Sequence, residues 1–424
     1  MNMTVIGLIS GTSYDAVDAA AARMRLAGDT LFLVPLGLHS VPIPAPLRAR
    51  IAAALPPHRT TVEEICRLDT TIGQLFGSVA ADANAALAGG AADLVSSHGQ
   101  TVYHWVDGRT ALGTLQLGEP AWIAEASGLP VVSGLRSRDI ARGGQGAPLA
   151  SLLDALLVLG DDRTVGSLNL GGIANITVWS DTGEIVAYDI GPASALMDRA
   201  VADATGGRER MDIDGVRAAR GRVDADLLTV LLAEPYYRLL PPKSTGKELF
   251  HADYLRAMAG EQELPLDDLL ATLTELTAIL VARSCREHGV RRLFVAGGGI
   301  RNPTLMGRIR ALTAPARVSV FDDLGMSAQG KEAYTMAVIG FLTVHGLPAT
   351  IPSATGAAPA SILGSLTPGA APLRLPAPAR SSPSRIMIVC VSVAAGPRSS
   401  ACWPSPCSAC DQGFRACACR YWVS

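Results

Sequence analysis

GLISGTSYDAVDAA, at residues 7–20, has the pattern of a strand end, a turn of small polar residues and the start of a second strand. Glycine and short side chains let successive backbone N–H groups approach phosphate oxygens closely. The turn also carries Asp15 and Asp18, and hard cations such as Mg²⁺ prefer oxygen ligands. An ordinary hairpin turn uses the same residue types for conformational reasons alone. The stretch by itself therefore leaves both interpretations open.

The second half of the chain repeats this pattern. LNLGGIANIT, at 168–177, predicts another strand, glycine turn and strand, and GEIVAYDIGPAS, at 183–194, predicts a strand that runs into a loop. A helix is expected over 265–288, and LFVAGGGIRNPTLM, at 293–306, predicts a buried strand, a glycine loop and a helix. Two glycine turns in corresponding places suit a two-sided phosphate clamp, and the GGG loop would let an adenine or ribose lie against the backbone. The alternative for each is a tight or packing turn.

This organisation predicts an α/β protein with a two-domain actin-like/hexokinase (ribonuclease H-like) fold and a nucleotide cleft between the domains. The expected domains are 1–150, with the first phosphate loop and part of the sugar site, and 151–370, with the second loop, the catalytic aspartate and the adenosine motif. A Rossmann fold is disfavoured because GGGIRNP is not G-x-G-x-x-G. The Pro/Ser/Arg/Cys-rich tail at 371–424 is expected to be disordered or non-native, and its cysteine spacing does not match a zinc site.

Composition narrows the class of protein. The 424 residues are 49% hydrophobic and 17% charged with a net charge of −2, which predicts a large core and no nucleic-acid partner. The longest apolar runs are shorter than the roughly 20 residues of a membrane span, so no membrane partner is expected. MNMTVIGLIS lacks the features of a secretory signal, which predicts a cytoplasmic protein. Only three of the 36 basic residues are lysines, and all three lie in the motifs PPKSTGKE and QGKEAY.

Asp189 is the first choice for a catalytic residue. It ends an apolar strand ahead of a Gly-Pro loop, where a carboxylate suits a general base that deprotonates a hydroxyl or a water. The alternative is that Asp189 caps a helix at 193–205.

The substrate is expected at three other segments. The loop at 134–150 offers arginine, which binds carboxylates bidentately, beside a Gly-Gly-Gln-Gly run. The segment at 96–105 contains a histidine whose ordinary role would be structural. Glu332 lies near a helix start, where it would bind sugar hydroxyls or complement the helix dipole. The candidate substrate-binding residues are Arg136, Asp139, Gly144, Gln145, His98 and Glu332.

Together these motifs resemble the anhydro-N-acetylmuramic acid kinase family. The matching stretches, in family order, include GLISGTSYDAVDAA, SSHGQTVYH, RSRDIARGGQGAPL, LNLGGIANIT, DIGPASALMD, PPKSTGKELF, VAGGGIRNPTLM and KEAYTMAVIGF, and they span about residues 4 to 370. The resemblance implies a homodimer that uses ATP and Mg²⁺ in cell-wall recycling. Water would open the ring of 1,6-anhydro-N-acetylmuramic acid while O6 takes the γ-phosphate, giving N-acetylmuramic acid 6-phosphate.

The resemblance also implies residue roles. Asp189 matches the base that activates the water, and residues 11–18 match the ATP-phosphate segment. The expected nucleotide-binding residues are Gly11, Thr12, Ser13, Tyr14, Asp15, Ala16, Val17 and Asp18 in the first turn, Gly171, Gly172 and Asn175 in the second, and Gly297, Gly298 and Gly299. Asp15 is preferred for the metal, with Asp18 structural.

The chain departs from the family pattern beside these residues. The family usually has Gly where Ala16 stands, and Thr and Gly where Ile190 and Ala193 stand. Two alternatives remain at this point: another sugar kinase of the same superfamily, and an ATP-gated binding protein of the actin or chaperone type.

Overall fold

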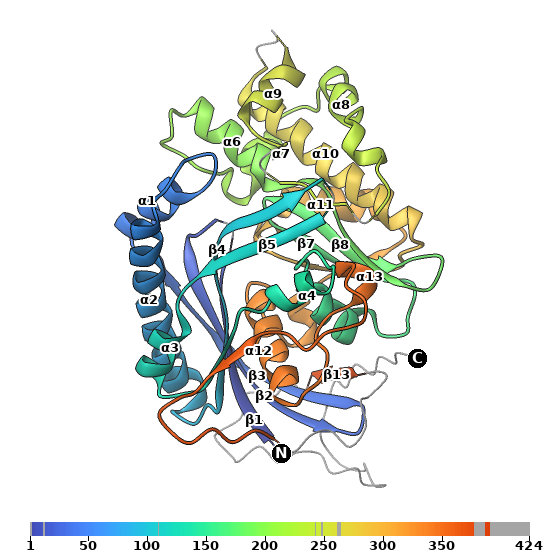
Figure 1. Ribbon diagram of the computed structural model, residues 1–424. Coiled ribbons are helices and arrows are strands. Elements are labelled where there is room, and N and C mark those ends of the chain that lie inside the picture. Colours follow the sequence, from blue (N-terminus) through green and yellow to red (C-terminus); the bar gives the residue numbers. More distant parts are fainter. Residues whose placement is uncertain are drawn as a thin grey trace. The chain divides into compact units, whose positions relative to one another are not determined.

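The computed structural model describes residues 2–11, 13–108, 110–241, 243–246, 249–260, 264–376 and 386–390 (Figure 1). The chain forms two compact units. The first unit contains Met1–Ala141, Leu324–Ala349 and the described residues from Ser361 onward, and the second contains Arg142–Asp323 and Thr350–Ala360. Both units are therefore discontinuous in sequence, whereas the ranges 1–150 and 151–370 expected from the sequence are contiguous. The difference arises because the segment after residue 323 returns to the sheet of the first unit.

The first unit is built on an eight-stranded sheet in the order β12-β6-β4-β1-β2-β3-β13, with β5 paired to β4. Strand β2 is antiparallel to both of its neighbours, β1 and β3, and β1, β4 and β6 are parallel. The bounds are β1 Asn2–Ser10, β2 Ala16–Ala27, β3 Thr30–Pro42, β4 Leu94–Asp107, β5 Thr110–Leu117, β6 Val131–Ser133, β12 Ser365–Thr367 and β13 Met387–Cys390.

Helices cover both faces of this sheet. They are α1 Ala45–Ala54, α2 Val62–Ala88, α3 Pro120–Ser127, α4 Ser137–Ala141 and α12 Lys331–Val344. Ile6 and Leu8 of β1 and Val17 and Ala19 of β2 share a core with α2. The alternate residues face α12, which lies against β1 and β2 (Figure 1). A Cβ on Gly7 would overlap the carbonyl oxygen of Ala333, so glycine is what lets α12 approach β1 so closely.

The second unit has a five-stranded sheet in the order β11-β10-β7-β8-β9. Its strands are β7 Val165–Leu170, β8 Ile173–Trp179, β9 Ile185–Pro192, β10 Arg292–Ala296 and β11 Arg317–Val320. Here too the middle one of three consecutive strands, β8, is antiparallel to both β7 and β9. Strand β10 pairs in parallel with β7, and β11 pairs in parallel with β10. The first unit has the same arrangement in β3-β2-β1-β4-β6. The repeat predicted from the two glycine turns, and with it the ribonuclease H-like fold, is confirmed.

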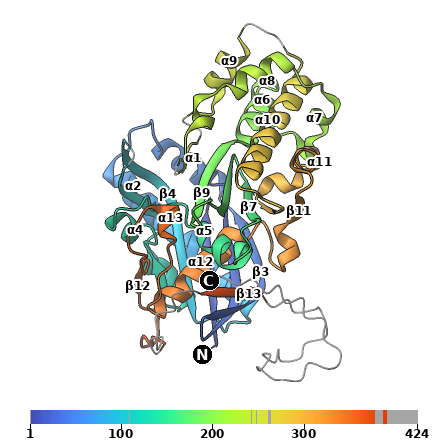
Figure 2. The same ribbon diagram turned by 90° about the vertical axis from the view of Figure 1, so that its right-hand side faces the viewer.

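The helices of the second unit are α5 Ser151–Leu153, the π-helix η1 Asp154–Leu159, α6 Ser194–Ala204, η2 Ile213–Gly215, α7 Val216–Arg220, α8 Ala225–Leu232, η3 Pro235–Arg238, α9 Ala252–Ala259, α10 Leu266–Glu287, η4 Gly298–Arg301, α11 Pro303–Thr313 and α13 Pro352–Thr355, with η5 Phe321–Leu324 at the boundary. Of these, α6, α7, α8 and α11 contact α10 (Figure 2). The predicted helix at 265–288 is confirmed as α10, whose apolar side packs with β7–β10.

Two further expectations concern the C-terminal tail and membrane spans. Within the tail predicted at 371–424, Met387–Cys390 forms β13 and pairs in parallel with β3. The tail cysteines at 402–419 lie outside the described residues, as does Thr12. Among the helices of the described ranges, none has the length and hydropathy that a membrane span requires.

Candidate active site

The turn between β1 and β2 places two carboxylates at the end of the first sheet. The Tyr14 N–H donates to the carbonyl oxygen of Gly11 at 3.1 Å, and Tyr14 has a φ of 41°, which closes the turn tightly. Asp15 is exposed, and its Oδ1 accepts a 2.7 Å hydrogen bond from the Ser13 hydroxyl. Asp18 pairs with Ile9 inside the sheet and is half-buried. The two carboxylates are therefore in different environments.

The carboxyl group of Asp18 is perturbed by its surroundings. Burial raises its pKa, a hydrogen bond with Ser40 lowers it, and the charge of Asp15 raises it further. Its Oδ1 is buried and has no hydrogen-bond partner among the residues that the structure describes. A buried carboxylate oxygen without a donor is costly unless a ligand supplies one. A metal ion, a metal-bound water or a substrate hydroxyl would satisfy this oxygen.

A buried pair of polar side chains supports the turn from the neighbouring strand. The Ser10 hydroxyl donates to Gln100 Oε1 at 2.6 Å, and Gln100 Nε2 lies 3.4 Å from the carbonyl oxygen of Gly11. Ser10 and Gln100 face each other where a bulge shifts the register of β1 and β4. The bulge contains His98 and Gly99, whose φ is 74°. Sequence analysis did not assign a role to Ser10 or Gln100.

His98 and Arg136 form the central contact of the predicted sugar site in this unit. Arg136 Nε donates to His98 Nε2 at 2.8 Å, and His98 Nδ1 lies 3.0 Å from the carbonyl oxygen of Gly99. The carbonyl can only accept, so Nδ1 carries the proton and Nε2 is the acceptor. Burial and the nearby positive charge of Arg136 lower the pKa of His98 to about 3. His98 is therefore neutral at physiological pH.

Arg136 lies among opposite charges. Burial lowers its pKa, whereas the carboxylates of Glu332 and Asp139 raise it. Asp139 is completely buried in α4. Its negative charge is therefore available to offset the desolvation of the guanidinium.

Glu332 reaches this cluster from the first turn of α12. Its side chain is exposed to solvent, yet the protein surrounds it closely enough that desolvation raises the pKa of its carboxyl group. Lys331 and Arg136 lower that pKa, and the charge of Asp18 raises it. Since Asp18 lies on the α12 face of β2, the close packing at Gly7 is what brings these two carboxylates near each other. The first unit thus joins Asp18, Glu332, Arg136, Asp139 and the neutral His98 in one polar cluster.

The donor set of the first turn fits a Mg²⁺ ion bound together with phosphates. No group of three or more His, Cys, Asp or Glu side chains with metal-binding geometry occurs among the described residues. Mg²⁺ in nucleotide sites is usually held by one or two carboxylates plus phosphate oxygens and waters. The orphaned Oδ1 of Asp18 and the exposed carboxylate of Asp15 meet that requirement.

In the second unit, the Gly171–Gly172 turn joins β7 to β8. The carbonyl oxygens of Gly171 and Gly172 accept hydrogen bonds from the N–H groups of Ser194 and Ala195 at 3.1 and 3.0 Å. These bonds tie the turn to the start of α6. Asn175, on β8, pairs across the sheet with Asp189 on β9. The predicted phosphate turn and the predicted base therefore lie on neighbouring strands.

Asp189 is held by its backbone and by its side chain. The Thr245 N–H donates to Asp189 Oδ2 at 3.0 Å, and the Tyr236 hydroxyl donates to the Asp189 carbonyl oxygen at 2.8 Å. The helix-cap alternative is wrong, because α6 begins after Ala193 and Asp189 lies within β9. A register shift places Ile190 as the extra residue of β9, and its side chain packs into the core. Sequence analysis missed Tyr236 and Thr245, although Thr245 lies within the PPKSTGKE motif and Tyr236 lies shortly before it.

The glycine loop after β10 has a packing role at two of its three positions. A Cβ on Gly297, whose φ is 87°, would lie 2.6 Å from the carbonyl oxygen of Leu170. A Cβ on Gly299 would lie 2.6 Å from the Leu170 Cβ. For Gly298 the nearest atom would be Arg301 Nη2 at 3.8 Å. The packing alternative therefore accounts for Gly297 and Gly299 but not for Gly298.

The loop at 134–150 does not belong to one unit. Arg136 and Asp139 lie in the first unit, whereas Gly144 and Gln145 lie in the second. The Gln145 N–H donates to the carbonyl oxygen of Thr355 at 2.7 Å, which ties this part of the loop to α13. The predicted sugar residues thus divide into two sets.

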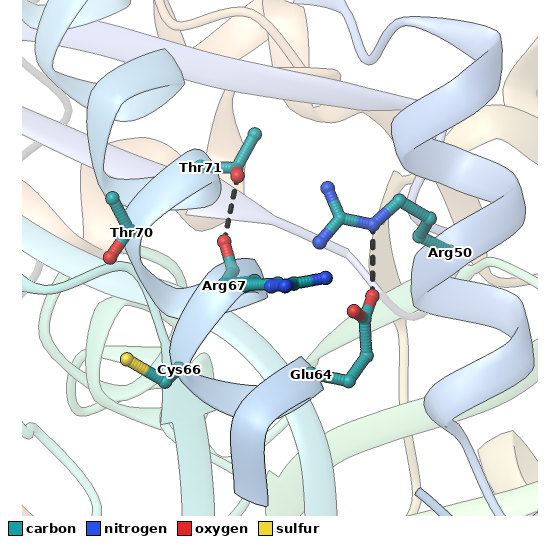
Figure 3. Close-up of a pocket in the computed structure, with 6 residues that line it drawn as sticks. All are labelled: Arg50, Glu64, Cys66, Arg67, Thr70 and Thr71. Atoms are coloured by element: carbon teal, nitrogen blue, oxygen red, sulfur yellow. Dashed lines mark hydrogen bonds and ion pairs between the residues drawn. The ribbon is translucent and has the colours of Figure 1, made fainter. Parts of the chain in front are cut away.

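A pocket of about 390 Å³ on helices α1 and α2 contains none of the predicted site residues (Figure 3). Its lining residues are Arg50, Glu64, Cys66, Arg67, Thr70 and Thr71. Arg50 Nε donates to Glu64 Oε1 at 2.8 Å beside it. The pocket offers no general base near a phosphate turn.

Comparison with known proteins agrees with these motifs. The sequence model of the family described as "Anhydro-N-acetylmuramic acid kinase" matches residues 3–369. The anhydro-N-acetylmuramic acid kinase of Streptomyces coelicolor is 56% identical over 91% of this chain and 99% of its own length. The protein of the same name from Gloeobacter violaceus is 40% identical over 86% of this chain and 98% of its own length.

Among solved structures, xylulose kinase from Rhodospirillum rubrum is similar with a TM-score of 0.40 at 14% identity, over 80% of this chain and 90% of that one. That likeness is too weak to carry weight. The sequence matches, which span nearly the whole of both proteins, are decisive. The chain belongs to the anhydro-N-acetylmuramic acid kinase family.

Proposed function

We propose that this protein uses ATP to convert 1,6-anhydro-N-acetylmuramic acid into N-acetylmuramic acid 6-phosphate in peptidoglycan recycling. The observation that carries the proposal is the family match over residues 3–369, which includes every segment that supplies a predicted site residue. We place the reaction in the cytoplasm, where ATP is available, and propose a homodimer because the family resemblance implies one. Sedimentation of the purified protein tests the oligomeric state.

Asp189 is the proposed general base. Its carboxylate takes a proton from a water molecule whose oxygen attacks C1 of the sugar. The bond between C1 and O6 breaks, and O6 forms a bond to the γ-phosphorus of ATP while the bond to the leaving ADP oxygen breaks. The Thr245 N–H and the Tyr236 hydroxyl hold Asp189 in one orientation, as positioning of a base requires.

The phosphates of ATP are the proposed ligands of the two glycine turns, residues 11–18 and 171–172 with Asn175. The GGG loop at 297–299 is the proposed nucleoside contact. Bound Mg²⁺ would neutralise charge on the transferred phosphoryl group, and Asp15 and Asp18 are the residues that would hold it.

Arg136 is the proposed receptor for the lactyl carboxylate of the sugar, because a guanidinium binds a carboxylate through two parallel hydrogen bonds. His98 and Asp139 orient and neutralise Arg136. Glu332, which is exposed and interacts electrostatically with Arg136, is the proposed partner of sugar hydroxyls. Gly144 and Gln145 are proposed to contact the same sugar.

Isotope labelling tests this function. With Mg-ATP and the anhydro sugar in H₂¹⁸O, the purified protein is expected to form the 6-phosphate sugar with ¹⁸O at C1. A 6-phosphate without ¹⁸O would instead indicate an ordinary sugar kinase. ATP turnover that ignores the anhydro sugar would indicate an ATP-gated binding protein.

A further inference from the structure

The motif PPKSTGKE contains a lysine that the proposed function does not use. Lys243 is one of only three lysines in the chain, which otherwise uses arginine as its basic residue. In the sequence it lies between helices η3 and α9, and its side chain is half-buried. A half-buried cation in a chain so poor in lysine suggests a local reason for an ammonium group.

The ammonium of Lys243 is bound by two carbonyl oxygens and two aromatic rings. Its Nζ lies 3.2 Å from the carbonyl oxygen of Tyr237 and 3.4 Å from that of Tyr236. It also lies 5.0 Å from the ring centroid of Tyr236 and 5.5 Å from that of Tyr188. Burial lowers the pKa of Lys243, and the charge of Glu287 raises it. Carbonyl and π-face contacts together favour a compact cation over neutral side chains of similar length.

The same segments hold the proposed base. The Asp189 N–H donates to the carbonyl oxygen of Lys243 at 3.2 Å. Two residues further along, the Thr245 N–H donates to Asp189 Oδ2 at 3.0 Å. Tyr236, whose carbonyl binds the ammonium, donates its hydroxyl to the Asp189 carbonyl oxygen at 2.8 Å. The contacts run from Lys243 through Tyr236 to Asp189 and back to Lys243 in a closed ring.

We propose that Lys243 is a positioning residue for Asp189. Its ammonium binds the Tyr236–Tyr237 backbone and thereby fixes the 243–245 segment against β9, so that the Thr245 N–H and the Tyr236 hydroxyl reach Asp189. The Lys243 ammonium is thus a side-chain anchor that joins this segment to η3. This inference rests on the proposed role of Asp189 as the base.

Arginine is not equivalent to lysine at this position. The planar guanidinium presents its donors in a fixed fork, whereas an ammonium directs three donors around one nitrogen. The two carbonyl oxygens and the two aromatic rings all contact the single nitrogen atom Nζ, an arrangement that suits an ammonium group. Lys243→Arg therefore keeps the charge and is expected to restore only part of the function that Lys243→Met loses.

The test compares Lys243→Met, Lys243→Arg and Tyr236→Phe with the wild type. Lys243→Met is expected to lower kcat by about 10- to 100-fold, because a misplaced base loses rate without losing substrate contacts. The KM values for ATP and for the sugar are expected to stay within about twofold. Amide hydrogen exchange in the peptide that contains residues 243–246 is expected to become faster, and this readout does not depend on turnover.

Arg308→Met is the matched control. It removes a cation from an ion pair of the same unit, in which Arg308 Nε lies 2.7 Å from Glu275 Oε2. It is expected to lower thermal stability without changing kcat or exchange at 243–246. If Lys243→Met does not fold, Tyr236→Phe and Lys243→Arg carry the comparison.

Unchanged kcat and unchanged exchange in folded Lys243 variants would overturn the positioning role. A kcat loss that merely parallels the loss of thermal stability, as judged against Arg308→Met, would overturn it as well. A wild-type protein that does not convert the anhydro sugar would instead overturn the proposed function, while the exchange comparison would still report whether Lys243 holds the segment.

Discussion

Arg136 Nε donates a 2.8 Å hydrogen bond to His98 Nε2, so a neutral histidine acts as the acceptor for an arginine. The opposite ring nitrogen is occupied by the carbonyl oxygen of Gly99. Arg136 therefore has one side of its guanidinium fixed by the bulge in β4, while Glu332 and Asp139 attract it electrostatically. This relationship gives His98 an orienting contact with Arg136, and the sugar contact expected for His98 from the sequence stays a prediction.

Replacing His98 with alanine is expected to weaken sugar binding. The Nε–H of Arg136 would lose its acceptor, and a buried donor without a partner costs about 1–3 kcal/mol. The KM for the sugar should therefore rise about tenfold or more while the KM for ATP changes little. Steady-state kinetics with each substrate varied in turn measures both values. His98→Gln, which can supply an oxygen acceptor, should recover part of the loss, and equal KM values in all three proteins would contradict the orienting role.

The same histidine predicts a pH dependence of stability. The pKa of His98 is lowered to about 3 in the folded protein, against about 6.5 in an unfolded chain. Between these values the unfolded state binds more protons, so the stabilisation is complete above pH 6.5 and is lost as the pH falls towards 3. Its contribution to the slope of unfolding free energy is up to about 1.4 kcal/mol per pH unit. Urea unfolding at a series of pH values should show a shallower slope for His98→Gln, and identical slopes would refute the assignment.

Much of the fold could be predicted from the sequence, because the relevant signals are local. Alternating strands, glycine turns and the amphipathic stretch of α10 define the two repeated sheets. The return of Lys331–Val344 to the first unit could not be predicted, since it depends on a long-range fit between Gly7 and Ala333. For the same reason the sequence did not predict that Glu332 would approach Asp18.

In the candidate site, too, local features could be predicted from the sequence and long-range contacts could not. Asp189 and the glycine turns are marked by their positions at strand ends, and Asp189 remains a prediction as the base. Tyr236 and Thr245 were missed because their importance lies in which atoms they bind, and aromatic or hydroxyl residues ahead of a loop carry no such signal on their own. In the sequence, this segment is marked by two of the chain's three lysines and by its resemblance to the family in PPKSTGKELF.

The metal prediction can be decided by comparing two aspartates. Asp15 is exposed and accepts from Ser13, whereas Asp18 is half-buried with an orphaned oxygen. A buried carboxylate oxygen without a partner gains more free energy from binding a metal ion than an exposed carboxylate does. Asp18→Asn is therefore expected to weaken Mg-ATP binding more than Asp15→Asn. Calorimetric titration with Mg-ATP, without the sugar, measures the difference. A larger loss of Mg-ATP affinity in Asp15→Asn would instead support Asp15 as the metal ligand, as the sequence predicted.

Close packing between α12 and β1 predicts a strong effect of a single methyl group. In Gly7→Ala the new Cβ would overlap the Ala333 carbonyl oxygen and approach the Ala337 nitrogen. Overpacking of this kind costs about 1–3 kcal/mol of unfolding free energy. Gly307→Ala is the control, because a Cβ there meets no atom within 4 Å and the helix α11 should gain up to about 1 kcal/mol. Denaturant unfolding should give the two variants opposite signs, and a neutral Gly7→Ala would contradict the described contact.

Alanine substitutions at two glycines of the loop 297–299 can distinguish a packing role from a nucleotide-binding role. Gly297→Ala adds a Cβ 2.6 Å from the Leu170 carbonyl oxygen at a φ of 87°, so the protein is expected to lose about 1–3 kcal/mol of stability. Gly298→Ala adds a Cβ with no atom nearer than 3.8 Å and should leave stability within about 0.5 kcal/mol. If the backbone at Gly298 lies against the nucleoside, the added methyl group should still raise the KM for ATP. A folded Gly298→Ala protein with an unchanged KM for ATP would mean that this loop serves the packing of β7 against β10 and that the nucleoside binds elsewhere.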